Sequence, residues 1–403
     1  MKSKSVTNFL ENFLKSNSLF VDKKFLQSNY TPESISHRDE QIHQIATILA
    51  PSLKLSKPSN LFIYGKTGTG KTLSVRYVAN QIINLAERNN TPIKIIYLNC
   101  KLKKIADTEY RLVAQLAREL GKTIPMTGLP TEEVYKIFFN IVDEEKQLIV
   151  IILDEIDQLV KKVGDEILYN LTRINSELKQ AQISIIGISN DLGFTDYMDP
   201  RVKSSLSEEE LVFPPYNALQ IQDILHQRAT KAFKDSILGS GVIEKCAAYA
   251  AREHGDARRA LELLRVAGEL AERESDTRVE LKHLDMAEEK IERDKVVDVV
   301  STQPKQFQAT LYSILLIHLQ NKDFISTGEI YGVYTNLCSK VGLRPLTQRR
   351  VSDIIAEFDM LGIINARVTS KGRYGRTRDI ALSVQPHIQQ RIQEILEKDL
   401  GLR

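Results

Sequence analysis

Cysteine is scarce in this sequence, and the few cysteines present lie far from one another. Cys100, Cys246 and Cys338 are the three cysteines of a 403-residue chain, and no two of them form a C-x-x-C pair. This spacing indicates neither a disulfide framework nor a cysteine-based zinc site. The seven histidines also lack a metal-ligand spacing. The composition therefore favours a protein of a reducing, intracellular compartment.

Long apolar runs are missing as well. The longest uninterrupted aliphatic stretch, Leu148–Leu153, is far too short to span a bilayer. The opening residues, MKSKSVTNFLENFLKS, lack the apolar core and the small-residue cleavage site of a signal peptide. With 42% hydrophobic and 27% charged residues, the chain has the composition of a folded globular protein, and its length suits two or three domains. We expect it to be cytoplasmic.

The chain also lacks a strong overall charge. Its net charge of +3 does not by itself predict a nucleic-acid partner. Residues 344–378, however, contain eight Lys/Arg against three Asp/Glu, a local balance of +5 that exceeds the charge of the whole chain. A concentrated basic stretch of this kind is expected where a protein contacts a polyanion.

Three segments with different patterns follow one another along the chain. From about residue 15 to 215, short apolar runs alternate with helical patterns, which predicts an α/β fold with a parallel sheet and crossover helices. Only helical patterns remain from about 217 to 294, with a break at His254-Gly255. We predict domains at 1–216, 217–300 and 301–403. The predicted strands of the sheet are Leu61–Tyr64, Ile95–Asn99, Leu148–Leu153, Ile183–Ile188 and Leu211–Phe213.

The third segment has the pattern of a winged helix, a helix-turn-helix with a β-hairpin attached. Three helical patterns are followed by two β-prone runs, IINARVT and RDIALSV. In the third helix, PLTQRRVSDIIAEFDMLG, apolar residues recur at helical spacing and predict a packing face. That face comprises Val351, Ile354, Ile355, Phe358 and Leu361.

The first turn of this third helix is polar and basic. Positive charge at a helix N-terminus opposes the helix dipole, so a purely structural helix gains nothing from it. A recognition helix, by contrast, presents its first turn to DNA bases and phosphates. The predicted DNA-contacting residues of this turn are Thr347, Gln348, Arg349 and Arg350.

The hairpin that follows carries a glycine-spaced basic turn, SKGRYGRT. Gly372 and Gly375 allow its backbone to approach a duplex closely. A charged hairpin is often only solvated, but the basic helix beside it favours contact with DNA. We predict phosphate contacts from the basic residues and packing on a sugar from the tyrosine of this hairpin, namely Lys371, Arg373, Tyr374, Arg376 and Arg378.

A phosphate-binding loop is indicated near the start of the first segment. The stretch GKTGTGKT matches GxxxxGK[ST] and lies between the strand LFIY and the helix TLSVRYVANQIINLAE. Lys71 is expected to reach the β- and γ-phosphates of ATP, and the Thr72 hydroxyl to be a ligand of Mg²⁺. The predicted nucleotide-binding residues of this loop are Gly65, Lys66, Thr67, Gly68, Thr69, Gly70, Lys71 and Thr72.

Acidic and polar side chains follow two further predicted strands. Asp154 and Glu155 come directly after a buried run, at the edge where ligands bind in open α/β sheets. Asp154 is expected to hold Mg²⁺, and Glu155 to polarise the attacking water. Asn190 is placed to orient that water, although an Asn-Asp pair is equally typical of a turn. Arg201 and Arg258 are either surface charges or the cations that stabilise a transferred phosphoryl group.

The order of these motifs resembles that of the AAA+ ATPases: Walker A, Walker B, sensor 1, arginine finger and sensor 2. By this resemblance Asn190 is sensor 1, and Arg258 is sensor 2 and contacts the nucleotide. The whole chain is similar to the archaeal origin-recognition initiators, relatives of subunits of the eukaryotic origin recognition complex. The segments that carry this resemblance are NYTPESISHRDEQI at 29–42, NCKLKKIADTEYRLVAQLARELGKTIPMTGLPTEEV at 99–134, DPRVKSSLSEEELVFPPY at 199–216 and GDARRAL at 255–261.

The resemblance implies further roles. Arg38 lies in the segment that packs against the adenine in this family, and Tyr216 is an implied nucleotide contact with it. Arg201 takes the arginine-finger position, where some members carry a second arginine and this chain has Ser205. Residues 101–133 match a helical insertion that touches DNA in the initiators.

We therefore expect a weak ATPase that initiates DNA replication, with ATP or ADP and Mg²⁺ as cofactors. It would bind origin duplex through the winged helix and the insertion, and use ATP as a switch to recruit or load a replicative helicase of the MCM type. Other initiator paralogues are possible partners, and the protein would be associated with the nucleoid. Two alternatives are a winged-helix transcription regulator or signalling ATPase, and a clamp loader, whose C-terminal part would be a helical collar.

Overall fold

A computed structural model describes residues 18–27, 30–32, 34–101, 107–122, 124–125, 128–194, 198–206, 208–319, 325–370, 376–384 and 386–402. The chain divides into two compact units, Met1–Leu284 and Asp285–Arg403. Helix α12 (Leu281–Thr302) contains the boundary between them. Among the described helices, none combines the length and the apolar character needed to cross a membrane.

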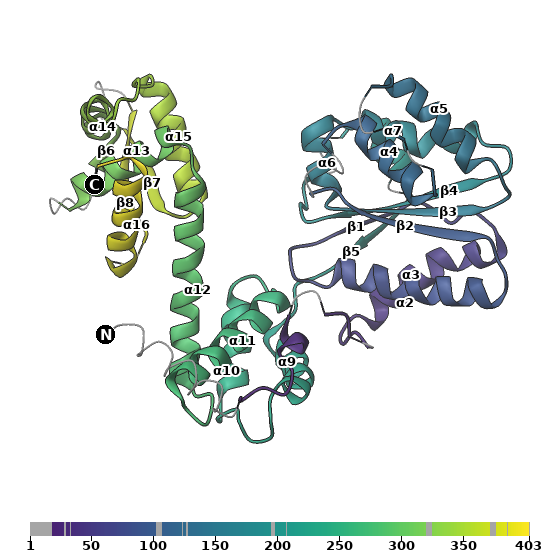
Figure 1. The fold of residues 1–403 in the computed structure, drawn as a ribbon, viewed down its shortest axis with the longest axis horizontal. Helices are drawn as coiled ribbons and strands as arrows, with labels where there is room; N and C mark the ends of the chain where they lie inside the picture. Colours follow the sequence, from purple (N-terminus) through teal and green to yellow (C-terminus); the bar gives the residue numbers. More distant parts are fainter. Residues whose placement is uncertain are drawn as a thin grey trace, which may run out of the picture. The chain divides into compact units, whose positions relative to one another are not determined.

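A five-stranded parallel sheet forms the centre of the first unit (Figure 1). Its strands lie in the order β2 (Ile93–Asn99), β3 (Leu148–Asp154), β4 (Gln182–Ser189), β1 (Leu61–Tyr64) and β5 (Glu209–Val212). Strand β3 is buried along its whole length, as expected for a parallel strand covered on both faces. One face packs against α4 (Glu109–Glu119), α5 (Thr131–Val142), α6 (Ile156–Val163), α7 (Glu166–Arg173) and α8 (Pro200–Leu206), and the other against α2 (Asp39–Leu49) and α3 (Lys71–Arg88).

All five predicted strands are present, and the predicted α/β class is confirmed. The largest difference is at β5, which begins at Glu209 and not at Leu211. This strand lies at the edge of the sheet, where Glu209 and Glu210 are exposed and only Leu211 is buried. An edge strand needs apolar residues on one face only, so its acidic start gave no strand signal.

A helical module follows the sheet within the first unit. It comprises α9 (Ala218–Ala232), α10 (Val242–Arg252) and α11 (Ala257–Glu274), and the predicted break at His254-Gly255 is confirmed. Gly255 has φ +68°, and a Cβ atom there would lie 2.4 Å from the carbonyl oxygen of Tyr216. Glycine is therefore required where the start of α11 packs against the connection from the sheet. We call this module the lid.

Residues 18–27, at the start of the described chain, pack on the lid. Phe20 stacks on Phe233 with ring centroids 4.5 Å apart. A Cβ atom on Gly268 would lie 2.4 Å from the Phe20 ring, so this glycine of α11 makes room for it. The Glu272 carboxylate accepts hydrogen bonds from Ser18 Oγ and Leu19 N, at 2.6 and 3.0 Å. The segment that leads toward residue 30 is thus anchored to the lid.

The second unit contains the predicted winged helix. Helices α13 (Lys305–His318), α14 (Thr327–Val341) and α15 (Gln348–Met360) precede a hairpin of β7 (Ile364–Ser370) and β8 (Arg376–Leu382). Two elements were not predicted, the short strand β6 (Ile325–Ser326), which pairs with β8, and helix α16 (Pro386–Asp399). A three-stranded sheet in this position contradicts the helical collar of the clamp-loader alternative.

One prediction for the packing face of α15 is wrong. Val351, Ile354, Ile355 and Phe358 are completely buried, but Leu361 is 47% exposed. Helix α15 ends at Met360, and Leu361 is its C-cap residue. The apolar spacing in the sequence continues one position beyond the helix, where the chain no longer follows the helical face.

Candidate functional site

A cleft of about 710 Å³ in the first unit gathers most of the predicted nucleotide-binding residues. Its wall is formed by the loop before α3, the ends of the sheet strands, the lid and part of the segment 27–36. The volume lies in the range of sites that hold small organic ligands. The predicted residues on this wall are Gly68, Thr69, Gly70, Lys71, Thr72, Asp154, Glu155, Asn190, Tyr216 and Arg258.

The loop between β1 and α3 turns at glycines that the lid and its connection approach closely. Gly68 and Gly70 have φ +69° and φ +92°, conformations that other residues rarely adopt. A Cβ atom on Gly68 would lie 1.7 Å from Asp256 Oδ1, and one on Gly70 would lie 2.8 Å from Tyr216 Oη. Both glycines are therefore needed for the turn and for the close approach of these two side chains.

Lys71 begins α3 and is buried at the base of this loop. Its Nζ donates to the carbonyl oxygens of Gly65 and Lys66, both at 2.7 Å. Burial lowers the pKa of the Lys71 ammonium to about 8, the Asp154 carboxylate opposes this shift, and the Arg258 guanidinium adds to it. The loop thus holds a buried ammonium group through two of its own carbonyl oxygens, and this group lines the cleft.

Asp154 and Thr72 place two hard oxygen donors side by side. Asp154 Oδ2 accepts from Thr72 Oγ1 at 2.9 Å and from Tyr97 Oη at 2.6 Å, while Oδ1 accepts from Glu155 N at 3.0 Å. Burial and the hydrogen bond to Asp154 raise the pKa of the Tyr97 phenol well above its ordinary value. Tyr97 therefore stays a neutral donor that fixes one orientation of the carboxylate. A hydroxyl and a carboxylate in contact are a donor set that suits Mg²⁺.

Glu155 is held in an unusual backbone conformation. Its φ and ψ of 55° and 46° are left-handed, and it stands at the N-cap position of α6. A non-glycine residue in this region is strained, and such strain is concentrated at functional sites. Its Oε2 lies 3.6 Å from Nζ of the exposed Lys101. The carboxylate lines the cleft next to Asp154.

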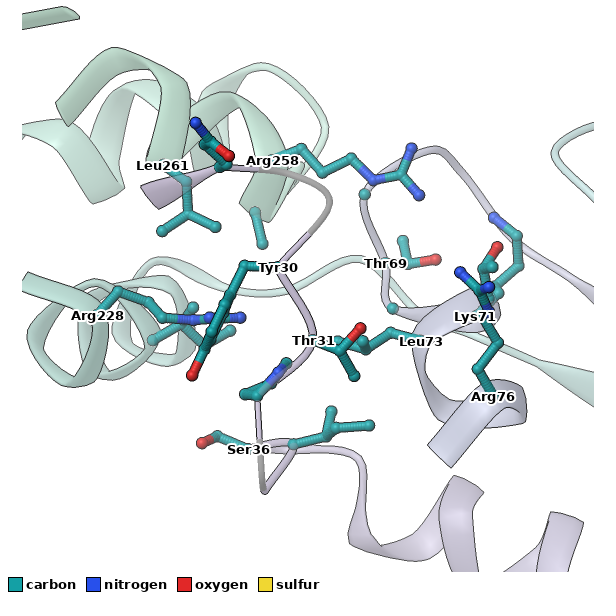
Figure 2. A pocket seen from close by; sticks show the side chains of 18 of the residues that line it. Tyr30, Thr31, Ser36, Thr69, Lys71, Leu73, Arg76, Arg228, Arg258 and Leu261 are labelled. Carbon is teal, nitrogen blue, oxygen red and sulfur yellow. The ribbon is translucent and has the colours of Figure 1, made fainter. Parts of the chain in front are cut away.

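Asn190 and Arg258 reach the same cleft from different elements. Strand β4 lies beside β3, with Ile188 opposite Asp154, so Asn190 follows at the same edge of the sheet. Arg258 is the second residue of α11. Figure 2 shows its side chain extending from the lid toward the loop that carries Thr69 and Lys71.

Arg38 does not line the cleft; it lies behind the loop. Its side chain is 2% exposed. Nε donates to the Thr69 carbonyl oxygen at 2.8 Å and Nη2 to that of Pro214 at 2.6 Å. The guanidinium also lies 3.8 Å from the centre of the Tyr216 ring. Arg38 thus ties the loop before α3 to the connection between sheet and lid, and its contact with a nucleotide stays a prediction.

Arg201 also lies outside the wall of the cleft. It is on α8, and its side chain is 70% exposed. Nε and Nη2 donate to the two oxygens of Asp199 at 3.0 and 2.9 Å, which lowers the pKa of this carboxyl to about 2. Its guanidinium lies 5.3 Å from the Tyr169 ring centre. Three further residues that were predicted to bind the nucleotide do not line the cleft either: Gly65, Lys66 and Thr67.

The second unit presents the predicted first turn of the recognition helix to solvent. Thr347 is the N-cap of α15, and its Oγ1 accepts from Arg350 N at 3.4 Å. Gln348, Arg349 and Arg350 follow it, and all are exposed. The Arg350 guanidinium lies 3.8 Å from Asp353 and 3.9 Å from Glu357 of the same helix. Exposed ion pairs of this kind are weak, so Arg350 can exchange them for another anion.

The hairpin residues are described only in part. Arg378 Nη1 donates to the Ser352 carbonyl oxygen of α15 at 3.1 Å, which ties β8 to the helix. Strand β8 begins at Arg376, but the side chain of Arg376 lies outside the part of the chain that the structure describes. So do Lys371, Arg373 and Tyr374 of the turn.

The cleft wall also contains residues that were not predicted, among them Tyr30, Arg76, Tyr97 and Arg228. Arg76 lies one helical turn beyond Thr72, so helical periodicity could have found it. The role of Tyr97 could be predicted only by someone who knew that β2 pairs with β3, because the Tyr97 hydroxyl on β2 donates to Asp154 at the end of β3. Tyr30 and Arg228 come from a loop and from the lid, and no local pattern marks them.

Comparison with known proteins agrees with this architecture. Residues 54–192 match the family described as "AAA domain", and residues 222–289 match the "Cdc6 AAA+ ATPase-type lid domain". Residues 298–390 match the "CDC6, C terminal winged helix domain". These matches follow the order of sheet, lid and winged helix in the structure.

Relatives also match this chain over nearly its whole length. The chain is 52% identical to the "ORC1-type DNA replication protein" of Pyrococcus abyssi over 98% of this chain and 93% of that protein. It is 52% identical to "ORC1-type DNA replication protein 1" of Methanosarcina acetivorans, over 95% of this chain and 92% of the other. The solved structure of the Aeropyrum pernix ORC1 protein in complex with DNA is 44% identical, with a TM-score of 0.85, and the similarity covers 94% of this chain and 97% of that one.

Proposed function

This chain belongs to the family of ORC1-type DNA replication proteins, which makes it a replication initiator, and we propose that bound ATP controls its hold on origin duplex DNA. The observation that carries the nucleotide half of this proposal is the convergence of Lys71, Asp154, Glu155 and Arg258 on one cleft. These are the groups that phosphoryl transfer requires: a cation on the phosphates, a metal-holding acid, a base and a mobile cation.

Lys71 and the backbone N–H groups of the loop bind the β- and γ-phosphates in this proposal. The turn at Gly68 and Gly70 directs successive N–H groups toward one point, and the N-terminus of α3 adds its dipole. Lys71 exchanges the carbonyl oxygens of Gly65 and Lys66 for phosphate oxygens. Its ammonium is thereby better compensated than by neutral carbonyl groups.

The adjacent Thr72 hydroxyl and Asp154 carboxylate fit Mg²⁺ and would hold it together. When bound, the metal supplies charge neutralisation on the β- and γ-phosphates. Tyr97 orients the carboxylate through its hydrogen bond to Oδ2.

Glu155 acts as the base that takes a proton from the attacking water, and Asn190 orients this water. Both lie at the strand edge that faces the cleft. Arg201 is paired with Asp199 outside the cleft of its own chain, so Arg201 of a second protomer would have to supply the positive charge to this cleft. When no second protomer supplies this charge, ATP hydrolysis is slow, which suits a switch that stays loaded with ATP for long periods.

The lid is the element through which the switch would act. Asp256 packs against Gly68, and the backbone N–H of Ala257 donates to the Gly68 carbonyl oxygen at 3.3 Å. Arg258, two residues after Asp256, senses the γ-phosphate. Loss of that phosphate removes the partner of Arg258 and shifts the equilibrium of the lid.

DNA binding is assigned to the first turn of α15 and the wing. The Aeropyrum pernix ORC1 protein, 44% identical, was solved in complex with DNA. Thr347, Gln348, Arg349 and Arg350 would meet base edges or phosphates. The wing would contact the sugar-phosphate backbone of the DNA through Lys371, Arg373, Tyr374, Arg376 and Arg378. Residues 101–133 would make a second contact with the duplex. The remaining partners proposed are an MCM-type helicase and initiator paralogues, on the nucleoid of the cytoplasm.

Replacing Arg350 with alanine is expected to weaken binding to the specific duplex by roughly 1–3 kcal/mol, the value of a bidentate contact to guanine. Binding to random duplex should change much less. The measurement is a fluorescence-anisotropy titration of both duplexes at one fixed salt concentration.

Arg391→Ala is the matched control for this variant. Arg391 is 59% exposed on α16 and pairs with Glu394 of its own helix, so the change removes the same charge and a similar ion pair. If both variants lose the same affinity on both duplexes, α15 does not read the DNA sequence, and this part of the proposal fails.

A further inference from the structure

Arg228 projects from α9 of the lid into the nucleotide cleft, away from the phosphate-binding loop. Figure 2 shows its side chain extending toward Tyr30, while Lys71 and Arg258 point to another part of the cleft. The guanidinium lies 4.5 Å from the centre of the Tyr30 ring. The side chain is 9% exposed, so the charged group has little access to solvent.

The Arg228 guanidinium is short of hydrogen-bond partners. Nη1 is buried and has no hydrogen-bond partner in the part of the chain that the structure describes. The face of the Tyr30 ring compensates the charge but accepts no N–H of the guanidinium plane. Burial lowers the pKa of this guanidinium, which nevertheless remains charged. A buried cation without an acceptor destabilises a fold, so its retention indicates a ligand that provides one.

Apolar side chains that can pack on a flat ring lie on the cleft wall near Arg228, together with polar ones such as Gln227 and Thr230. Ile224 lies one turn before it on α9, and Leu261 of α11 and Tyr30 line the same region of the cleft. Lys71 and Arg258, which would serve the phosphates of a nucleotide, point to another part of the cleft than Arg228 (Figure 2), so Arg228 is not needed for the phosphates. What remains is the base, a planar ring whose edge carries acceptor nitrogens.

We propose that Arg228 recognises the purine base of the bound nucleotide, with Nη1 donating a hydrogen bond to a ring nitrogen and Tyr30 holding the guanidinium in plane. This inference rests on the proposed function, because it concerns the same nucleotide site. The guanidinium has donors only, so it requires an acceptor on the base edge. Adenine offers three such ring nitrogens, N1, N3 and N7.

This arrangement also links the base to the lid. Arg228 belongs to α9, and Tyr30 follows residues 18–27, which pack on the lid. A purine ring that accepts a hydrogen bond from Arg228 would therefore stabilise the position of the lid with ATP and with ADP alike. Arg258, in contrast, would distinguish ATP from ADP. Arg228 and Arg258, both on the lid, would contact opposite ends of one ligand.

The test uses the full-length protein with Arg228→Met and measures ADP binding by calorimetry and the unfolding temperature without nucleotide. Methionine has a similar length and removes the charge. We expect the ADP affinity to fall by roughly 10- to 100-fold, the value of a hydrogen bond to a charged group. The unfolding temperature of the nucleotide-free variant should be equal to or higher than that of the wild type, because a buried unpaired charge is lost. Lys234→Met, which removes an exposed charge just after α9, should change neither value.

A comparison of ADP with its 1-deaza, 3-deaza and 7-deaza analogues identifies the accepting nitrogen. The wild type should bind one of the three at least about 10-fold more weakly than ADP, and Arg228→Met should no longer distinguish that analogue from ADP. If the variant lowers the unfolding temperature and keeps the ADP affinity, or penalises the analogues as the wild type does, Arg228 is a structural residue and the inference is wrong. If the wild type itself does not bind ADP, the proposed nucleotide function fails instead.

Discussion

Replacing Lys71 with alanine is expected to reduce the affinity for Mg·ATP by about 30-fold or more. Removing one partner of a buried, hydrogen-bonded charge pair costs about 2–5 kcal/mol, and 1.4 kcal/mol corresponds to tenfold in affinity. Lys71 is buried at the base of the loop, and its Nζ donates to the carbonyl oxygens of Gly65 and Lys66. Backbone N–H groups alone cannot replace a full positive charge.

Two measurements check this prediction: the nucleotide content of the purified protein and a titration with Mg·ATP. Lys136→Ala is the matched control, because it removes an exposed lysine from α5, 71% exposed and paired only loosely with Glu133 at 3.8 Å. The control should bind nucleotide as the wild type does. A Lys71→Ala protein with unchanged nucleotide content would show that the loop does not bind phosphate.

Replacing Glu155 with glutamine is expected to slow ATP turnover by roughly 10²- to 10⁴-fold, the contribution typical of a general base. The amide cannot accept a proton from water. Asp154 and Thr72 keep their mutual hydrogen bond, so the affinity for Mg·ATP should stay within about threefold of the wild type. The measurement is single-turnover hydrolysis without DNA, together with a binding titration.

Glu155 also lies 3.6 Å from Lys101, and the loss of this ion pair must be separated from the loss of the base. Lys101→Ala removes the pair and keeps the carboxylate. Because the Lys101 side chain is 71% exposed, we expect little effect of this variant on turnover. If Glu155→Gln abolishes ATP binding, or if both variants slow turnover equally, Glu155 is not the base.

The cleft residues of the glycine loop and of the strand ends could be predicted from the sequence because their geometry is local. Lys71 and Thr72 follow a short glycine loop, and a strand and a helix flank this loop in the sequence. Asp154 and Asn190 each come at the end of a strand, and parallel strands end at the same edge of a sheet. The glycine-loop motif and the rule that parallel strands end at one edge of a sheet were enough to predict that these residues lie together.

Other residues could not be predicted in the same way. The packing of the lid brings Arg228 and Tyr30 to the cleft wall, and the pairing of β2 with β3 brings Tyr97 there. Arg38 was predicted near the adenine from a family resemblance alone, and its side chain donates to the carbonyl oxygens of Thr69 and Pro214. A motif gives the position of such a residue in the chain but not the direction of its side chain.

The error at Leu361 has a similar origin. An apolar residue at helical spacing continues the pattern, but the helix ends at Met360 because the following Gly362 adopts φ +72°. Periodicity does not show where the hydrogen-bonded ladder stops. The start of the same helix was easier to locate, since Thr347 is a favourable N-cap residue and accepts from Arg350 N.

Footprinting on genomic DNA, with Mg·ATP and with Mg·ADP, tests the central claim most directly. The account predicts discrete protected duplex sites whose occupancy differs between the two nucleotides in the wild type. Lys71→Ala, whose affinity for nucleotide should be strongly reduced, should give one pattern in both conditions at nucleotide concentrations that just saturate the wild type. Absence of discrete sites, or wild-type protection that is the same with ATP and ADP, would contradict an initiator whose hold on origin DNA is controlled by ATP.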